Sequence, residues 1–139
     1  MDLMLDAEYT VIIINLINWP YNVDSVIKIV FMAFGVKHSY AKNFGGRKND
    51  IFKTFLSSLS IKIMAHPEEL QAIFNAIRIL EYNGWIKIDK DKIKLEKRFE
   101  ENIPKNNFMK SMEKKDVNPL IEIKNMSDYV FLEEVLQYV

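Results

Sequence analysis

Two groups of cationic side chains have the clearest potential for chemistry in this sequence, namely the binding of phosphate groups. The first group lies in a polar segment between residues 37 and 48, and the second in a segment of alternating apolar and charged residues between 86 and 97. Cations at this density can neutralise a nucleic-acid backbone without reading its bases. The lysines of the second segment could instead only keep an exposed edge hairpin soluble. The candidate phosphate contacts are Lys37, His38, Lys42, Arg47, Lys48, Lys87, Lys90, Lys92 and Lys94.

The sequence offers little for catalysis or for metal binding. Its two histidines, His38 and His66, belong to different predicted elements, and there is no cysteine to complete a zinc site. No serine lies in the glycine-framed turn of a hydrolase, and Gly45-Gly46-Arg47-Lys48 lacks the spacing of a nucleotide-binding loop. Adjacent glutamates such as Glu68 and Glu69 should diverge by about 100° on a helix and face solvent. We therefore predict no catalytic residue, no cofactor and no metal, and a protein that is not an enzyme.

Composition indicates one compact domain with appendages, in a protein of the cytoplasm. The chain has 139 residues, of which 49% are hydrophobic and none is cysteine, so its stability must come from packing. Its longest apolar runs are too short to cross a bilayer, and acids stand where a signal peptide has cations. The net charge is zero, but residues 1–27 hold four acids and no base, whereas 37–98 hold thirteen bases and seven acids. Such a basic surface attracts phosphate or an acidic partner, unless the acidic end of the chain packs on it.

The first half of the chain is predicted to form three helices. The first covers residues 5–17 and ends before Pro20, because proline disfavours helical geometry at the preceding residue. Four consecutive β-branched residues from Val11 make a strand the alternative for this segment. Asn22 is the predicted cap of the second helix, whose broad apolar stripe extends to Phe34. A polar surface loop then precedes a third helix that begins at Asn49 or Asp50.

A fourth helix that leads into a hairpin is the most distinctive pattern. The helix begins with Pro67 and ends at Gly84, which can take the left-handed conformation that closes a helix. Apolar and charged residues then alternate over 86–89 and 92–96, which predicts two strands joined by Lys90 and Asp91. We therefore predict a mainly α fold with a small β-hairpin, a winged-helix-like domain over residues 1–98. The predicted inward side chains of the fourth helix are Leu70, Ile73, Phe74, Ile77 and Leu80.

The rest of the chain is predicted to be a linker and a tail. Residues 99–118 alternate charges with few apolar anchors, which indicates a poorly packed polar linker or a polar helix. In the tail, residues 119–139, the segment 120–123 could be extended, and Ser127 caps a final helix whose apolar side needs a surface to cover. The candidate protein-interface residues, at the two ends of the chain, are Ile12, Leu16, Val130, Phe131, Val135 and Leu136.

The order of these elements resembles a family of small bacterial subunits. An apolar first helix is followed by the stretch VDSVIKIVFMAF at residues 23–34 and by the polar turn Lys37-His38-Ser39-Tyr40. A helix over 52–59 and a helix that leads to Gly84-Trp85-Ile86 and the hairpin complete the pattern. Over roughly residues 5–96 it looks like the middle components of bacterial ABC three-component systems, which include the small accessory subunit of Lamassu-type anti-phage defence.

The resemblance implies a non-catalytic adaptor that bridges an SMC-like coiled-coil ATPase and an effector, often a nuclease, and that supplies no catalytic residue. Double-stranded DNA is a further candidate partner through the basic segments, and no membrane partner is expected. The alternative is a stand-alone winged-helix transcription regulator that dimerises through its terminal helices. A third reading is a small toxin, antitoxin or anti-phage enzyme whose site is not visible in the sequence.

Overall fold

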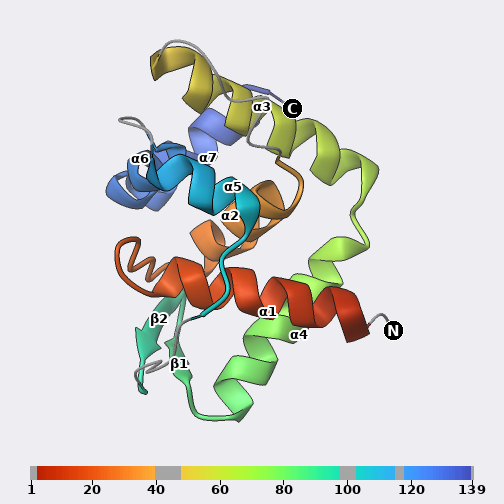
Figure 1. Cartoon of the computed structure of the whole chain (residues 1–139), viewed down its shortest axis with the longest axis vertical. Coiled ribbons are helices and arrows are strands. Elements are labelled where there is room, and N and C mark those ends of the chain that lie inside the picture. Colours follow the sequence, from red (N-terminus) through yellow and green to blue (C-terminus); the bar gives the residue numbers. More distant parts are fainter. Residues whose placement is uncertain (1–2, 40–47, 98–102, 115–117, 139) are drawn as a thin grey trace.

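Helices dominate the structure, a computed structural model that describes residues 3–39, 48–97, 103–114 and 118–138 (Figure 1). Of residues 48–50 only the backbone is described. The predicted mainly helical fold with a small antiparallel hairpin is confirmed. The elements in chain order are α1 (Leu3–Ile17), α2 (Val26–Lys37), α3 (Lys48–Ala65), α4 (Glu69–Tyr82), β1 (Ile86–Asp89), β2 (Lys92–Leu95), α5 (Asn107–Glu113), α6 (Pro119–Asn125) and α7 (Asp128–Leu136).

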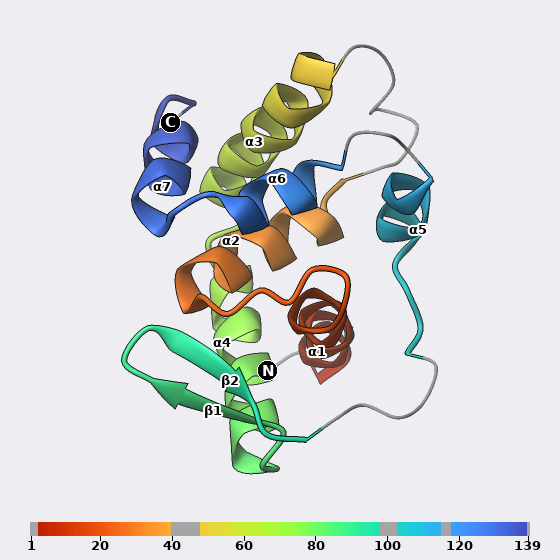
Figure 2. The same ribbon diagram turned by 90° about the vertical axis from the view of Figure 1, so that its left-hand side faces the viewer.

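Helix α2 lies at the centre of the molecule, in contact with α1, α3, α4, α6 and α7 (Figure 2). Its buried residues, among them Ile29, Met32 and Phe34, occur all around its circumference, which is typical of a core helix. The predicted cap at Asn22 is wrong. The Ser25 hydroxyl instead accepts a hydrogen bond from the backbone N–H of Lys28, and Asn22 has a left-handed φ of 49°.

The hairpin is attached both to α4 and to the segment that leads into α2. Gly84 has the predicted left-handed φ, 77°, and turns the chain from α4 into β1. The two strands pair antiparallel, with Ile88 opposite Ile93. On its other edge β2 meets the residues before α2, since the Ile93 N–H donates to the Asp24 carbonyl at 2.7 Å and Ser25 is bridged to Lys92. The hairpin therefore completes the unit formed by α1, α2 and α4.

Part of the segment predicted as a polar linker belongs to the core. Residues 103–114 include α5, in which Phe108, Met109 and Met112 are buried. Phe108 stacks on Phe55 of α3, with the ring centroids 5.7 Å apart. The prediction of a poorly packed linker is wrong for these residues, because apolar side chains at positions i, i+1 and i+4 give even a short helix one side that can be buried.

The C-terminal helices cover α2 and α3. The segment 120–123, predicted as extended, is helical, because the Asn118 side chain caps α6 and Pro119 occupies its first turn. The predicted cap of α7 by Ser127 is confirmed. The buried Lys28 of α2 joins this corner to the core, since its Nζ donates to the carbonyl of Lys124 at 3.0 Å and also to that of Met126.

Candidate functional site

A buried carboxylate, that of Glu69 at the start of α4, is the centre of a polar cluster between three helices. Glu69 is only 8% exposed. Its Oε1 accepts a hydrogen bond of 2.8 Å from the Tyr9 hydroxyl of α1 and lies 3.4 Å from Lys37 Nζ at the end of α2. His38 Nε2 lies 3.0 Å from Glu69 Oε2. The prediction that Glu69 belongs to a solvated helix face is therefore wrong, because folding surrounds it with hydrogen-bond donors.

The hydrogen bonds of this cluster keep Glu69 ionised. Burial disfavours the charged carboxylate, but hydrogen bonds from Tyr9 and His38 outweigh that effect, and the pKa of Glu69 is lowered. Burial lowers the pKa of His38 despite the nearby carboxylate, so this ring is neutral near neutral pH. The contact between His38 and Glu69 is then a hydrogen bond from a neutral imidazole rather than an ion pair. Burial, together with Glu69, raises the pKa of Tyr9, whose hydroxyl stays protonated and donates.

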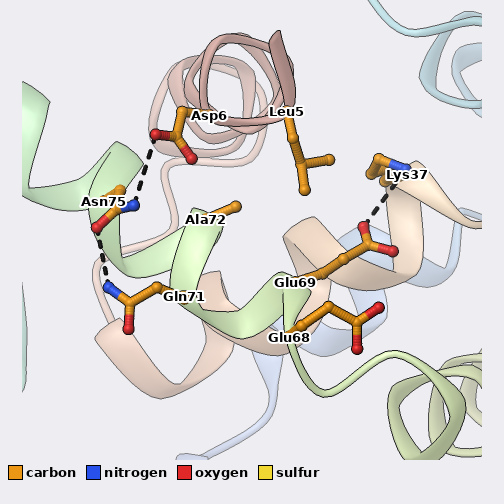
Figure 3. A pocket seen from close by; sticks show the side chains of 8 residues that line it. All are labelled: Leu5, Asp6, Lys37, Glu68, Glu69, Gln71, Ala72 and Asn75. Atoms are coloured by element: carbon orange, nitrogen blue, oxygen red, sulfur yellow. Dashed lines mark hydrogen bonds and ion pairs between the residues drawn. The ribbon is translucent and has the colours of Figure 1, made fainter. Parts of the chain in front are cut away.

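A pocket of about 520 Å³, lined mainly by polar and charged residues, opens beside the cluster, between α1 and α4 (Figure 3). Asn75 crosses one side of it, with its Nδ2 3.5 Å from Asp6 Oδ2, and accepts a hydrogen bond of 2.9 Å from Gln71. Carboxylates outnumber cations in the wall, so the pocket suits a cation or a hydrogen-bonding group better than an anion. The lining residues are Leu5, Asp6, Lys37, Glu68, Glu69, Gln71, Ala72 and Asn75.

The two histidines, far apart in sequence, lie next to each other. The His66 ring stacks on His38 with the centroids 5.5 Å apart and the planes 5° from parallel. His66 Nδ1 is 3.4 Å from Glu68 Oε1. The turn at Pro67, between α3 and α4, returns the chain to the end of α2, and it places Glu68 just before the first residue of α4. Sequence reasoning missed this grouping because it treated Glu68 and Glu69 as neighbours on one regular helix.

The phosphate contacts predicted in the segment 37–48 are only partly described. Lys42 and Arg47 lie outside the described residues, and so does the side chain of Lys48. The side chains of Lys37 and His38 are 19% and 16% exposed, and both contact Glu69. Their donors are therefore directed at a carboxylate of the same chain, and the prediction that they face an external phosphate is wrong.

The hairpin presents the other predicted phosphate contacts at the surface. Lys87, Lys90, Lys92 and Lys94 are all exposed. Lys87 lies directly opposite Lys94 on the neighbouring strand, and like charges in this position are unfavourable in a sheet. Ile86 and Ile93, on the other face, are buried against the core. One face of the hairpin thus presents three exposed lysines, which we call the lysine face (Lys87, Lys92 and Lys94), together with the exposed Asp89, which lies opposite Lys92.

Helix α4, which precedes the hairpin in the chain, carries exposed aromatic side chains. Tyr82 is 92% exposed and Phe74 42%. Arg78, also exposed, lies four residues from each, so the three share one side of the helix, which we call the α4 face (Phe74, Arg78 and Tyr82). The prediction that Phe74 points inward is wrong. Ala72 and Ala76 are buried, and their small side chains allow α4 to pack closely on α1.

The predicted protein-interface residues divide into buried and exposed ones. Ile12, Leu16, Phe131 and Val135 are buried in the core of their own chain. For these four the prediction of a partner-facing position is wrong, because α1 packs on α2 and α4, and α7 packs on α2 and α3. Val130 and Leu136 of α7 are 42% and 66% exposed. These two remain candidates for contact with another protein.

The comparisons with known proteins assign this chain to no family. No family model, no curated protein sequence and no solved structure matches the chain. None of the helices within the described ranges has both the length and the apolar character needed to span a bilayer.

Proposed function

We propose that this chain is a non-catalytic adaptor subunit that bridges an SMC-like coiled-coil ATPase and an effector in an anti-phage defence complex. The α4 face is the observation that carries the proposal. Two exposed aromatic side chains and an arginine lie along one side of α4, and these are the residue types that dominate the energy of protein interfaces. Burial of the exposed Tyr82 against a partner would remove its large apolar ring from water, and its hydroxyl could still form a hydrogen bond.

The arrangement around α4 further supports a docking module. We infer a winged-helix domain in which α1, α2 and α4 form the three-helix core and the hairpin is the wing. The bridge between Ser25 and Lys92 supports this reading, because a short strand before the second helix commonly pairs with the wing in such domains. Helix α3 is then an insertion between the second and third core helices. The α4 face occupies the position of a recognition helix, but it presents aromatic residues in place of several base-reading side chains.

Co-purification with the products of the adjacent genes tests the adaptor role. We expect the full chain to form a stable complex with a coiled-coil ATPase among them. Phe74→Ala and Tyr82→Ala should each weaken binding by roughly tenfold or more, as interface hot spots do. Tyr129→Ala is the matched control, since Tyr129 is an exposed tyrosine on α7. A wild-type chain that stays monomeric and binds none of these proteins would overturn the adaptor role, and unchanged binding by both α4 variants would overturn the α4 face as its interface.

The lysine face favours a second function, contact with the backbone of double-stranded DNA, either within such a complex or in the alternative role of a transcription regulator. An anion between Lys87 and Lys94 would relieve the repulsion of two like charges held opposite each other. Contacts of this kind are independent of base sequence and weaken steeply as salt is raised.

The salt dependence of DNA binding tests the lysine face. The plot of log affinity against log salt has a negative slope. We expect the double variant Lys87→Gln/Lys94→Gln to make this slope less steep by about 1–2, since each phosphate contact contributes about 0.9. Lys110→Gln, at an exposed position on α5, is the matched control and should leave the slope unchanged. A wild-type chain with no affinity for a duplex at low salt would overturn the DNA contact. A footprint confined to one operator sequence would favour the regulator over the adaptor.

A further inference from the structure

We propose that His66, Glu68 and Glu69 bind a divalent transition-metal ion, represented by Zn²⁺, where the turn after α3 meets α4. One ligand atom from each of the three residues lies within 4.8 Å of the other two. Ligands at Zn–N and Zn–O distances of about 2.0–2.2 Å in a tetrahedral site lie roughly 3.3–3.6 Å from one another. The side chain of Glu68 is 69% exposed, so it can rotate through the remaining distance without repacking the core.

The donor set selects the type of metal. One imidazole and two carboxylates suit Zn²⁺ and related transition metals, whereas Mg²⁺ and Ca²⁺ prefer oxygen ligands alone. Three protein ligands leave a fourth position for water or for a group from another molecule. Glu68 and Glu69 also line the pocket of Figure 3, which gives an ion access from solvent.

Contacts with neighbouring side chains orient two of the proposed ligands, Glu69 and His66. Tyr9 and Lys37 approach Glu69 Oε1, whereas Oε2 has a hydrogen bond only with His38 among the described residues. Oε2 therefore keeps lone-pair capacity for a metal ion. The stacking of His66 on His38 fixes the plane of the proposed imidazole ligand. Outer contacts of this kind orient metal ligands and strengthen metal binding.

The local charge also favours a cation. Glu68 and Glu69 supply two negative charges, against one positive charge from Lys37, and Asp6 adds a third carboxylate to the same pocket. A bound divalent ion would therefore balance a local surplus of negative charge.

Isothermal titration of the metal-free, tag-free full chain with ZnCl₂ tests the proposal. We expect one site per chain. His66→Ala and Glu68→Gln should each lower the affinity by at least about tenfold, because loss of an outer contact alone costs 10- to 100-fold. Glu81→Gln is the matched control, since Glu81 is an exposed glutamate at the other end of α4. Co²⁺ in place of Zn²⁺ should give the visible absorption of a tetrahedral ion, and excess Mg²⁺ should leave both signals unchanged.

The outcomes distinguish metal binding at this site from nonspecific binding elsewhere on the surface. Both ligand variants replace exposed side chains, and their circular dichroism should match that of the wild type. Absence of Zn²⁺ binding by the wild type would overturn the site. Binding that is equally strong in His66→Ala and Glu68→Gln would overturn it as well, because the ion would then lie elsewhere. Neither result depends on the proposed adaptor role.

Discussion

Removal of one hydroxyl, by Tyr9→Phe, should destabilise this protein more than its size suggests. The ring of Tyr9 is fully buried and its hydroxyl donates to the ionised, buried Glu69 at 2.8 Å. Phenylalanine keeps the packing of the ring and deletes only this hydrogen bond. Hydrogen bonds to charged groups contribute about 1.5–3 kcal/mol to the free energy of unfolding. For a chain of 139 residues that loss corresponds to a fall in Tm of roughly 5–10 °C.

The second buried tyrosine supplies a matched control. Tyr21 is 1% exposed, and its hydroxyl accepts a hydrogen bond of 2.9 Å from the Asn118 side chain, a neutral group. Tyr21→Phe should therefore cost only about 0.5–1.5 kcal/mol, the usual contribution of a neutral hydrogen bond. Both variants keep the ring. The difference between their losses in free energy of unfolding therefore reports how much more a hydrogen bond to a charged partner contributes than one to a neutral partner.

A double-mutant cycle with Glu69→Gln isolates the interaction. Glutamine keeps an oxygen acceptor but carries no charge, so Tyr9→Phe in that background should cost about as much as Tyr21→Phe in the wild type, roughly 0.5–1.5 kcal/mol. Urea unfolding followed by circular dichroism provides the free energies. A cost of Tyr9→Phe that is no larger than that of Tyr21→Phe, or that stays the same beside Glu69→Gln, would refute the reasoning.

Three further predictions concern stability. Lys28→Met should lower the free energy of unfolding by about 1–2 kcal/mol, because two partly buried carbonyls, of Lys124 and Met126, lose their donor. An unchanged urea midpoint would contradict this prediction. Gly35→Ala should lower the free energy of unfolding by about 1–3 kcal/mol, because the added Cβ would lie 2.6 Å from a ring carbon of the buried Phe55. Thermal unfolding measures this loss. A variant with the wild-type Tm would show that the Phe55 ring moves aside at no cost in stability. The lowered pKa of Glu69 gives stability that is present above the ordinary carboxyl pKa of about 4.3 and is lost as the pH falls through the folded value. Glu69→Gln should flatten the acid limb of the stability profile measured in urea, and equal limbs would speak against this assignment.

Local patterns predicted the local structure well. The alternation of Ile86 and Ile88 with charged residues predicted β1, and Gly84 and Ser127 mark the end of α4 and the start of α7 as expected. These features depend on a few neighbouring residues, whose backbone preferences and hydrogen bonds act over one turn of chain. Asn118 and Pro119 are an equally local signal for α6, but the prediction of an extended segment over 120–123 did not take this cap into account.

The candidate site depends on contacts between distant residues, which periodicity does not reveal. Glu69 meets Tyr9, 60 positions away, and His38, 31 positions away. Each of these residues alone has the pattern of an ordinary surface or core position, and only the crossing of α1, α2 and α4 brings them together. The burial of Phe108 escaped notice for a related reason, because a short helix gives too few turns for a clear apolar period.

The central position of α2 affects how this protein reaches its native state during synthesis. The two last helices that cover it follow it by more than 80 positions in the sequence. Ribosomes add roughly 5–20 residues per second, so the apolar residues on that side of α2 wait for roughly 5–20 s before α7 has been made. During this interval the nascent chain offers an uncovered apolar helix to chaperones, and native packing is complete only once α7 has left the ribosome.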